Sequence, residues 1–318
     1  MIIRLAHVEV GVSDLQKSAE FYCDLLGFHE AERTAEALYL RAAEEYDSWS
    51  LKLADRGGPG LVSIGFRVSS PDDLTELEAL HDRLGLKHTK LPVGFEPGRG
   101  VGLRVLREEG CAIDFHHEID EVDVYGEGGT ITPLARRRGV HVGPSPVALD
   151  HVNLRVDDAD AAVAYFVDGL EFSISEQGLT HEGRVEAAWL RRTRASHDVA
   201  ILASAELGCH HFAYTVPDPG SLLRTADLLA DYGYWDVLQF GPGRHGVSNA
   251  MAMYFLDPDG NRVEFFNGDI HRDLDRPPLT WTPEQLNSIP GGRFWWGSKP
   301  TPGFLLSTPY LDAEWPAE

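Results

Sequence analysis

Two histidines and one glutamate in the second half of the sequence have the residue types of a metal site. His151, His211 and Glu264 lie in three separate segments whose apolar and polar residues alternate as in half-buried strands. If these strands are neighbours, two imidazoles and one carboxylate reach the same side of a sheet. This set is the facial triad of non-haem Fe(II) oxygenases, which leaves coordination positions open for a substrate with two oxygens and for O2. The sequence therefore predicts an iron site with these three ligands.

The strand period also predicts which side chains accompany the ligands. In the segment 149–156, His151 shares its face with Asn153 and Arg155. In the next matched segment the same alternation sends His210 to the face opposite His211. We therefore expect only one of the two adjacent histidines to reach the metal.

Each ligand taken alone also has an ordinary explanation. A single histidine in a strand, such as His151 or His211, is more often a structural or surface residue. Glu264 is harder to explain in this way, because an unpaired carboxylate in an apolar strand is costly to bury. The metal interpretation rests on all three residues together, at matching positions of an internal repeat.

The repeat divides the chain into two similar halves. Residues 5–10 reappear in similar form at 149–154, and each copy continues through a polar pair into an amphipathic helix. The N-terminal positions that match the triad are His7, Ser63 and Asp114, so one nitrogen ligand is missing there. We expect the first copy to support folding or assembly without binding the metal.

Each half contains the order strand, helix and three strands more than once, which predicts an α+β fold of paired βαβββ modules. The expected domains are a degenerate one over 1–125 and a metal-binding one over 147–269. A linker with glycine and proline is expected over 126–146, and a C-terminal extension that closes over the site over 270–318. The Asp-Pro-Asp-Gly sequence at 257–260 predicts a hairpin turn between two strands.

Composition excludes several classes of protein. The chain has 28 basic and 50 acidic residues and a formal charge of −22, which disfavours nucleic acid and anionic membranes as partners. Cys23, Cys111 and Cys209 are odd in number and widely spaced, which is typical of neither a disulfide framework nor a zinc site. No apolar stretch approaches the ~18 residues of a membrane span, and a reduced, cytoplasmic setting is predicted.

With these residues in place, the sequence resembles the type I extradiol dioxygenases of the vicinal oxygen chelate superfamily, in particular the catechol 2,3-dioxygenases and homoprotocatechuate 2,3-dioxygenases. The most specific stretch is Gly-Pro-Gly-Arg-His-Gly-Val-Ser-Asn at 241–249, followed by 254–264. Segments 149–153, 209–211 and 279–281 add to a likeness that covers nearly the whole chain. The resemblance implies two vicinal oxygen chelate domains, Fe(II) in the triad (or Mn(II), as in some relatives) and a homotetramer.

The resemblance also implies roles around the metal. His197 matches a residue that contacts bound O2 and handles its protons, and His245 and Tyr254 match residues that hydrogen-bond the substrate oxygens. Arg293 marks the position where the C-terminal segment closes over the site. The implied substrate-binding residues are Asn153, Trp189, Phe240, His245, Tyr254 and Arg293.

The implied reaction is cleavage of a catechol by O2 to a 2-hydroxymuconic semialdehyde. In homoprotocatechuate enzymes an arginine that grips the substrate's carboxylate precedes the Gly-Pro-Gly-Arg-His sequence, but here the residue is Phe240. Losing that charge-assisted contact would weaken binding of an anionic side chain by about 1.5–3 kcal/mol. The sequence therefore favours catechol or an alkyl- or aryl-substituted catechol, although Arg293 leaves the homoprotocatechuate reaction open.

Other activities on the same scaffold are the alternatives. Isomerases of this fold usually need a fourth protein ligand, and oxygenases that use a 2-oxo acid lack the Gly-Pro-Gly-Arg-His sequence. A non-enzymatic protein that sequesters a ligand would need no metal triad, so bound stoichiometric iron would exclude it.

Overall fold

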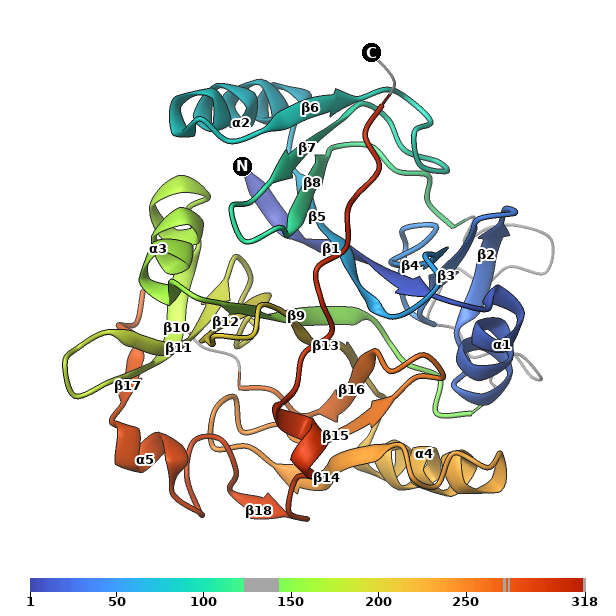
Figure 1. Ribbon diagram of the computed structural model, residues 1–318, viewed down its shortest axis with the longest axis vertical. Helices are drawn as coiled ribbons and strands as arrows, with labels where there is room; N and C mark the ends of the chain where they lie inside the picture. Colours follow the sequence, from blue (N-terminus) through green and yellow to red (C-terminus); the bar gives the residue numbers. More distant parts are fainter. Residues whose placement is uncertain (123–142, 271–272, 274, 317–318) are drawn as a thin grey trace.

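The computed structural model describes residues 1–122, 143–270, 273 and 275–316, and it contains two similar sheets (Figure 1). The first module of the N-terminal sheet consists of β1 (Ile2–Val12), α1 (Leu15–Ala19), the π-helix η1 (Glu20–Leu25), β2 (His29–Arg33), β3 (Ala37–Arg41) and β4 (Leu51–Asp55). The second consists of β5 (Gly60–Val68), α2 (Pro71–Leu84), β6 (His88–Leu91), β7 (Gly102–Leu106) and β8 (Ala112–His116).

The second half of the chain repeats this order. Its first module consists of β9 (Leu149–Val156), α3 (Ala159–Ala164), the π-helix η2 (Tyr165–Gly169), β10 (Ser173–Leu179), β11 (Val185–Arg191) and β12 (Val199–Ala203). Its second consists of β13 (Gly208–Thr215), α4 (Pro219–Asp231), β14 (Leu238–Arg244), β15 (Met251–Leu256) and β16 (Arg262–Asn267). The extension adds β17 (Leu279–Trp281), α5 (Pro283–Asn287), β18 (Trp296–Gly297) and the 3-10 helix η3 (Pro302–Leu305).

The two sheets have the same topology. The first has the order β2-β3-β4-β1-β5-β8-β7-β6, and the second has the matching order β10-β11-β12-β9-β13-β16-β15-β14 with β17 and β18 added at its edges. In both, the first strands of the two modules pair antiparallel at the centre. The predicted α+β fold of paired βαβββ modules is confirmed. The linker predicted over 126–146 lies mostly outside the described residues.

Local sequence explains where the first helix of each half begins. The Asp14 side chain accepts hydrogen bonds from the backbone N–H groups of Gln16 and Lys17, and Asp158 accepts one from that of Ala161. These aspartates are N-caps at the predicted polar pairs. Each helix then widens into a π-helical turn, which the sequence pattern did not predict.

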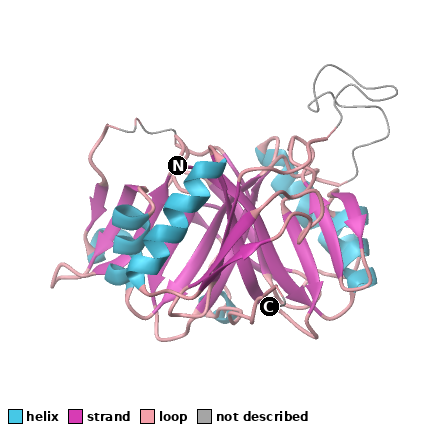
Figure 2. Ribbon diagram, turned by 90° about the horizontal axis from the view of Figure 1, so that it is seen from above, coloured by secondary structure: helices cyan, strands magenta, loops and turns pink. Residues whose placement is uncertain are grey.

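Strands occupy the middle of the molecule and helices lie on its flanks (Figure 2). One apolar core contains residues of both halves. In it the ring centroids of Phe28 and Tyr214 lie 4.8 Å apart, and those of Phe66 and Phe172 lie 5.5 Å apart. The C-terminal segment runs back from the second half across to the first (Figure 1), where Tyr310 bridges to Leu61. The three cysteines are free. None of the described helices is long and apolar enough to span a membrane.

The predicted hairpin turn also joins the two halves. The Asp257 carboxylate accepts three backbone N–H groups of the turn, those of Asp259, Gly260 and Asn261. The Asn261 side chain, 1% exposed, donates to the Gly11 carbonyl and accepts from the Gly60 N–H at 3.0 Å. One amide thus satisfies two buried backbone groups of the other domain.

We predict that Asn261→Ala destabilises the protein by about 1–3 kcal/mol, because it leaves those two backbone groups buried without partners. The free energy of unfolding in urea measures this loss. Gln16→Ala, an exposed change in the first helix, is the control and is expected to stay within about 0.5 kcal/mol of the parent. A loss in Asn261→Ala no larger than that of the control would contradict the prediction.

Candidate metal centre

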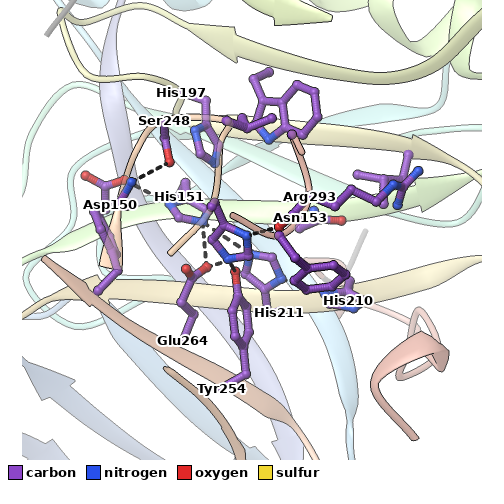
Figure 3. A pocket seen from close by; sticks show the side chains of 18 of the residues that line it. Asp150, His151, Asn153, His197, His210, His211, Ser248, Tyr254, Glu264 and Arg293 are labelled. Carbon is purple, nitrogen blue, oxygen red and sulfur yellow. Dashed lines mark hydrogen bonds and ion pairs between the residues drawn. The ribbon is translucent and has the colours of Figure 1, made fainter. Parts of the chain in front are cut away.

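The register of the second sheet brings the predicted ligands together. His151 on β9 lies opposite Ala213 on β13, Ala213 lies beside Glu264 on β16, and Glu264 lies opposite Tyr254 on β15. Because Ala213 has only a methyl group, the space between His151 and Glu264 stays open above it. His211, two residues before Ala213 on the same face, fills one side of that space (Figure 3).

The three donor atoms converge at hydrogen-bond distances. His151 Nε2 lies 3.1 Å from His211 Nε2, and both nitrogens lie 3.0 Å from Glu264 Oε2. Ligands about 2.1 Å from a metal lie about 3.0 Å apart when they are at right angles and about 3.4 Å apart in a tetrahedron. The observed triangle therefore fits three adjacent corners of an octahedron. The residues present suit an Fe(II)- or Mn(II)-type ion with its remaining positions open.

Two hydrogen-bond chains fix which nitrogen of each imidazole faces the metal position. His151 Nδ1 donates to Asp150 Oδ1 at 2.8 Å. His210 Nε2 donates to the Phe304 carbonyl at 2.7 Å, so its Nδ1 must accept from His211 Nδ1 at 2.6 Å. In both ligands Nε2 is therefore the nitrogen that would turn a lone pair to a metal. Asp150, His210 and the Phe304 carbonyl orient the ligands, as outer partners do in metal sites.

The position of His210 corrects the sequence-based expectation that it faces away from His211. The pairing of β13 with β9 shifts register between Cys209 and His211. Strict alternation fails at such an irregularity, and both imidazoles line the same cavity with ring centroids 5.0 Å apart.

The charges of the triad depend on one another. Burial would raise the pKa of Glu264, but the nearby His211 and the hydrogen bonds from both histidines hold it well below its usual value. Burial lowers the pKa of His211 to about 4, although Glu264 opposes this. Burial also disfavours charge on His151, but its bonds to Asp150 and Glu264 outweigh it and raise the pKa to about 10. The pKa values of the two imidazoles differ in direction because both histidines share the Glu264 carboxylate. A bound cation would replace the proton that the triad holds.

The cavity beside the triad collects most of the predicted site residues. The predicted residues that line it are Asn153, Trp189, His197, His245, Tyr254 and Arg293. Asn153 is buried and its Oδ1 accepts no hydrogen bond from the described part of the chain. Phe294, Phe304 and Leu305 of the C-terminal extension form one wall.

Phe240 was predicted to bind the substrate, but it does not line the cavity. It is 1% exposed and packs behind the lining, with its ring 5.5 Å from that of His245 and 5.9 Å from that of Tyr254. Its predicted role came from the resemblance alone, and β14 shifts register on both sides of Phe240. Phe240 therefore supports the two residues that face the cavity.

Three polar side chains face the metal position from different elements. The His245 Nδ1 donates to the Arg293 carbonyl, so its Nε2 accepts from the Tyr254 hydroxyl at 3.0 Å. Burial, with the Glu264 charge beside it, holds the pKa of Tyr254 well above its usual value. The His197 ring lies 4.0 Å from that of His151. Burial, and to a smaller extent the charge of His151, hold the pKa of His197 well below its usual value. Tyr254 and His197 are therefore both neutral.

The N-terminal sheet has the same row of positions without a metal triad. His7 lies opposite Gly65, Gly65 lies beside Asp114, and Asp114 lies opposite Arg104. Arg104 Nε and Nη2 each lie 2.7 Å from an oxygen of Asp114, while Ser63 occupies the position of His211. Among the described residues, only the C-terminal triad gathers three metal-binding donors. In the first half the Arg104 guanidinium balances the charge of the buried Asp114 carboxylate.

Sequence reasoning assigned no role to several residues of the site, among them Asp150, Arg155, His210 and Phe304. Asp150 and His210 are each adjacent to a ligand, and an acceptor or donor next to a metal-binding histidine is a signal that could have been used. Phe304 acts through its carbonyl, so its side chain gives no signal of this contact.

Comparison with known proteins agrees with this geometry. Residues 4–123 and 148–265 match the family described as the Glyoxalase/Bleomycin resistance protein/Dioxygenase superfamily. A metapyrocatechase from Pseudomonas sp. (strain CF600) is 31% identical over 90% of this chain and 92% of its own. A manganese-dependent 2,3-dihydroxybiphenyl 1,2-dioxygenase from Geobacillus genomosp. 3 is 26% identical over 95% of this chain and 96% of its own.

Solved structures add the same relationship in three dimensions. Homoprotocatechuate 2,3-dioxygenase from Arthrobacter globiformis superimposes with a TM-score of 0.89 at 32% identity, over 98% of this chain and 93% of that one. The site and fold define a member of the Glyoxalase/Bleomycin resistance protein/Dioxygenase superfamily, and within that superfamily the chain belongs to the extradiol dioxygenases.

We predict that His210→Ala lowers the affinity for Fe(II) or Mn(II) by about 10–100-fold, because His211 loses the acceptor that fixes its tautomer. Equilibrium metal binding under anaerobic conditions measures the effect without turnover. His181→Ala, at a side chain that is 71% exposed, is the matched control and should bind metal as the parent does. Equal affinities of the His210 variant and the parent would exclude this role.

Proposed function

We propose that this protein is an Fe(II)-dependent extradiol dioxygenase that opens the ring of catechol or a substituted catechol with O2. The product would be a 2-hydroxymuconic semialdehyde, in which both atoms of O2 are retained after the bond beside one hydroxyl is cleaved. The observation that carries the proposal is the nearly equilateral triangle of His151, His211 and Glu264 donor atoms, 3.0–3.1 Å on a side, inside a cavity. The family relationship supports the same reaction.

A divalent metal held by the triad would supply Lewis acidity to the two hydroxyl oxygens and a route for electrons between ring and O2. The chain itself would bind and orient the ring. Tyr254, beside Glu264, is placed to hydrogen-bond a substrate oxygen, and its own proton already points to His245. The pair can therefore take a proton from a substrate hydroxyl, first to Tyr254 and then to His245 Nε2.

His197 would handle protons on the other side of the triad. Its Nδ1 lies 3.1 Å from Ser196 Oγ, which leaves Nε2 for the cavity it lines. A neutral imidazole first accepts a proton and later returns it, so His197 can serve the O–O cleavage step as acid. Trp189 and Asn153 would bound the substrate ring at the floor of the cavity.

The metal and the assembly belong to the same proposal. Two imidazoles and one carboxylate suit both Fe(II) and Mn(II), and one relative is named as manganese-dependent. We favour Fe(II) by the resemblance to catechol and homoprotocatechuate 2,3-dioxygenases, and the same resemblance supports a homotetramer. Stripping the metal should abolish activity, and comparing restoration by Fe(II) with that by Mn(II) identifies the preferred ion.

The direct test is to mix protein, Fe(II) and catechol without oxygen and then admit air. We expect oxygen uptake and a yellow ring-opened product in equal amounts. A protein that binds catechols but takes up no oxygen with any of them would instead be a ligand-sequestering member of the fold.

We predict that His197→Phe lowers turnover by about 10²–10⁴-fold, because the proton donor is lost while the metal ligands stay in place. Oxygen uptake at saturating catechol measures the change. Bound metal should equal that of the parent, which separates this effect from metal loss. Unchanged turnover with every substrate would remove His197 from the mechanism.

A further inference from the structure

A buried arginine in the catalytic cavity has almost no protein partner. Arg155 on β9 is 9% exposed and lines the cavity. Its guanidinium donates to the Leu305 carbonyl, but its buried Nε has no acceptor among the described residues. In the same part of the chain no carboxylate forms an ion pair with Arg155 within 4.0 Å. Burying such a charge without a counter-ion is costly.

A second buried arginine nearby makes more hydrogen bonds to the protein than Arg155 does, although its own Nε also has no acceptor among the described residues. Arg262 donates to the carbonyls of His210, Gly303 and Leu306 at 2.7–2.9 Å, and its guanidinium lies 5.2 Å from the centre of the Phe304 ring. Arg262 does not line the cavity. The Arg155 guanidinium differs on both counts: it donates to one carbonyl and lines the cavity.

Arg155 lies where a ring substituent would reach. It is two residues beyond Asn153 and four beyond His151 on the same face of β9, and each two-residue step advances about 6.6 Å. A ring whose oxygens sit at the triad would extend along this face. Leu202, opposite Arg155 on β12, lines the same end of the cavity.

A second cation stands near that end. Arg293 lines the cavity and pairs with Glu186 at 2.8 Å, and Figure 3 shows it on the side of the triad away from Asp150. Burial lowers the pKa of Arg155; Glu206 opposes the shift, and the charge of Arg293 adds to it. Of the two guanidinium groups only Arg293 has a carboxylate partner among the described residues, so an anion in the cavity would meet the charge of Arg155.

We propose that Arg155 is a specificity-determining residue of this site, and that its guanidinium binds an anionic substituent, such as a carboxylate, on the ring of the catechol. The inference rests on the proposed function and narrows its substrate class. It also accounts for Phe240: the charge missing at that position is supplied from another strand, because Phe240 packs behind the lining whereas Arg155 faces the cavity. The apolar substituents favoured by the sequence would leave Arg155 buried without a counter-ion.

The test compares Arg155→Gln with the parent on a matched pair of substrates, 3,4-dihydroxyphenylacetate and the neutral 4-ethylcatechol. Glutamine removes the charge but can still donate to the Leu305 carbonyl. We expect kcat/KM for the anionic substrate to fall about 10–100-fold, mainly through KM, and that for 4-ethylcatechol to change by less than about threefold. Arg155→Lys, which restores a charge, should recover part of the loss. Arg184→Gln, at a side chain 65% exposed, is the control.

Binding of 4-hydroxyphenylacetate, measured by calorimetry without oxygen, gives a readout independent of turnover, and Arg155→Gln should weaken it by a similar factor. Equal losses for both substrates would show that Arg155 only supports the C-terminal segment and would overturn the inference. So would unchanged kinetics with both. If the parent cleaves neither substrate, the proposed function fails instead, whereas cleavage with no dependence on Arg155 leaves that function standing.

Discussion

The arrangement of this protein depends on one row of side chains across four strands. His151, Ala213, Glu264 and Tyr254 lie side by side on β9, β13, β16 and β15. The small residue in the second position separates the first and third by two strand spacings, which is the room that a metal ion and its ligand bonds require. Three buried metal-binding atoms lie 3.0–3.1 Å apart, where hydrogen bonds join them and a bound cation would replace the proton that they hold. The register of the four strands fixes this spacing.

The C-terminal extension completes the site rather than merely covering it. The Phe304 carbonyl orients His210 and, through it, His211, while the Leu305 carbonyl accepts from Arg155. Arg262 ties the same turn to β16 through two further carbonyls. Because these contacts use backbone oxygens, the position of the extension is coupled to the orientation of His211 and to that of the Arg155 guanidinium at the far end of the cavity.

The sequence predicted the repeated modules and the ligands because both leave periodic signals. Strand alternation and the matching of two halves were enough to select His151, His211 and Glu264, and their convergence follows from the register. Alternation misplaced His210, because a register shift in β13 interrupts the period there. The resemblance that selected Phe240 could not show that its ring packs behind the lining of the cavity. Alternation did place Arg155 on the inward face, but whether a buried arginine is satisfied depends on carbonyls far away in sequence, and no local pattern reports them.

The pairing of Arg104 with Asp114 in the first half has a consequence for the whole molecule. The two halves place matching strand positions side by side, and in the first half a covalently attached positive charge lies where the second half has its candidate metal site. That half can complete its interior during folding whatever the supply of metal in its surroundings. It shares a continuous core with the other half, so its packing supports the strands of the candidate metal site whether or not that site holds an ion.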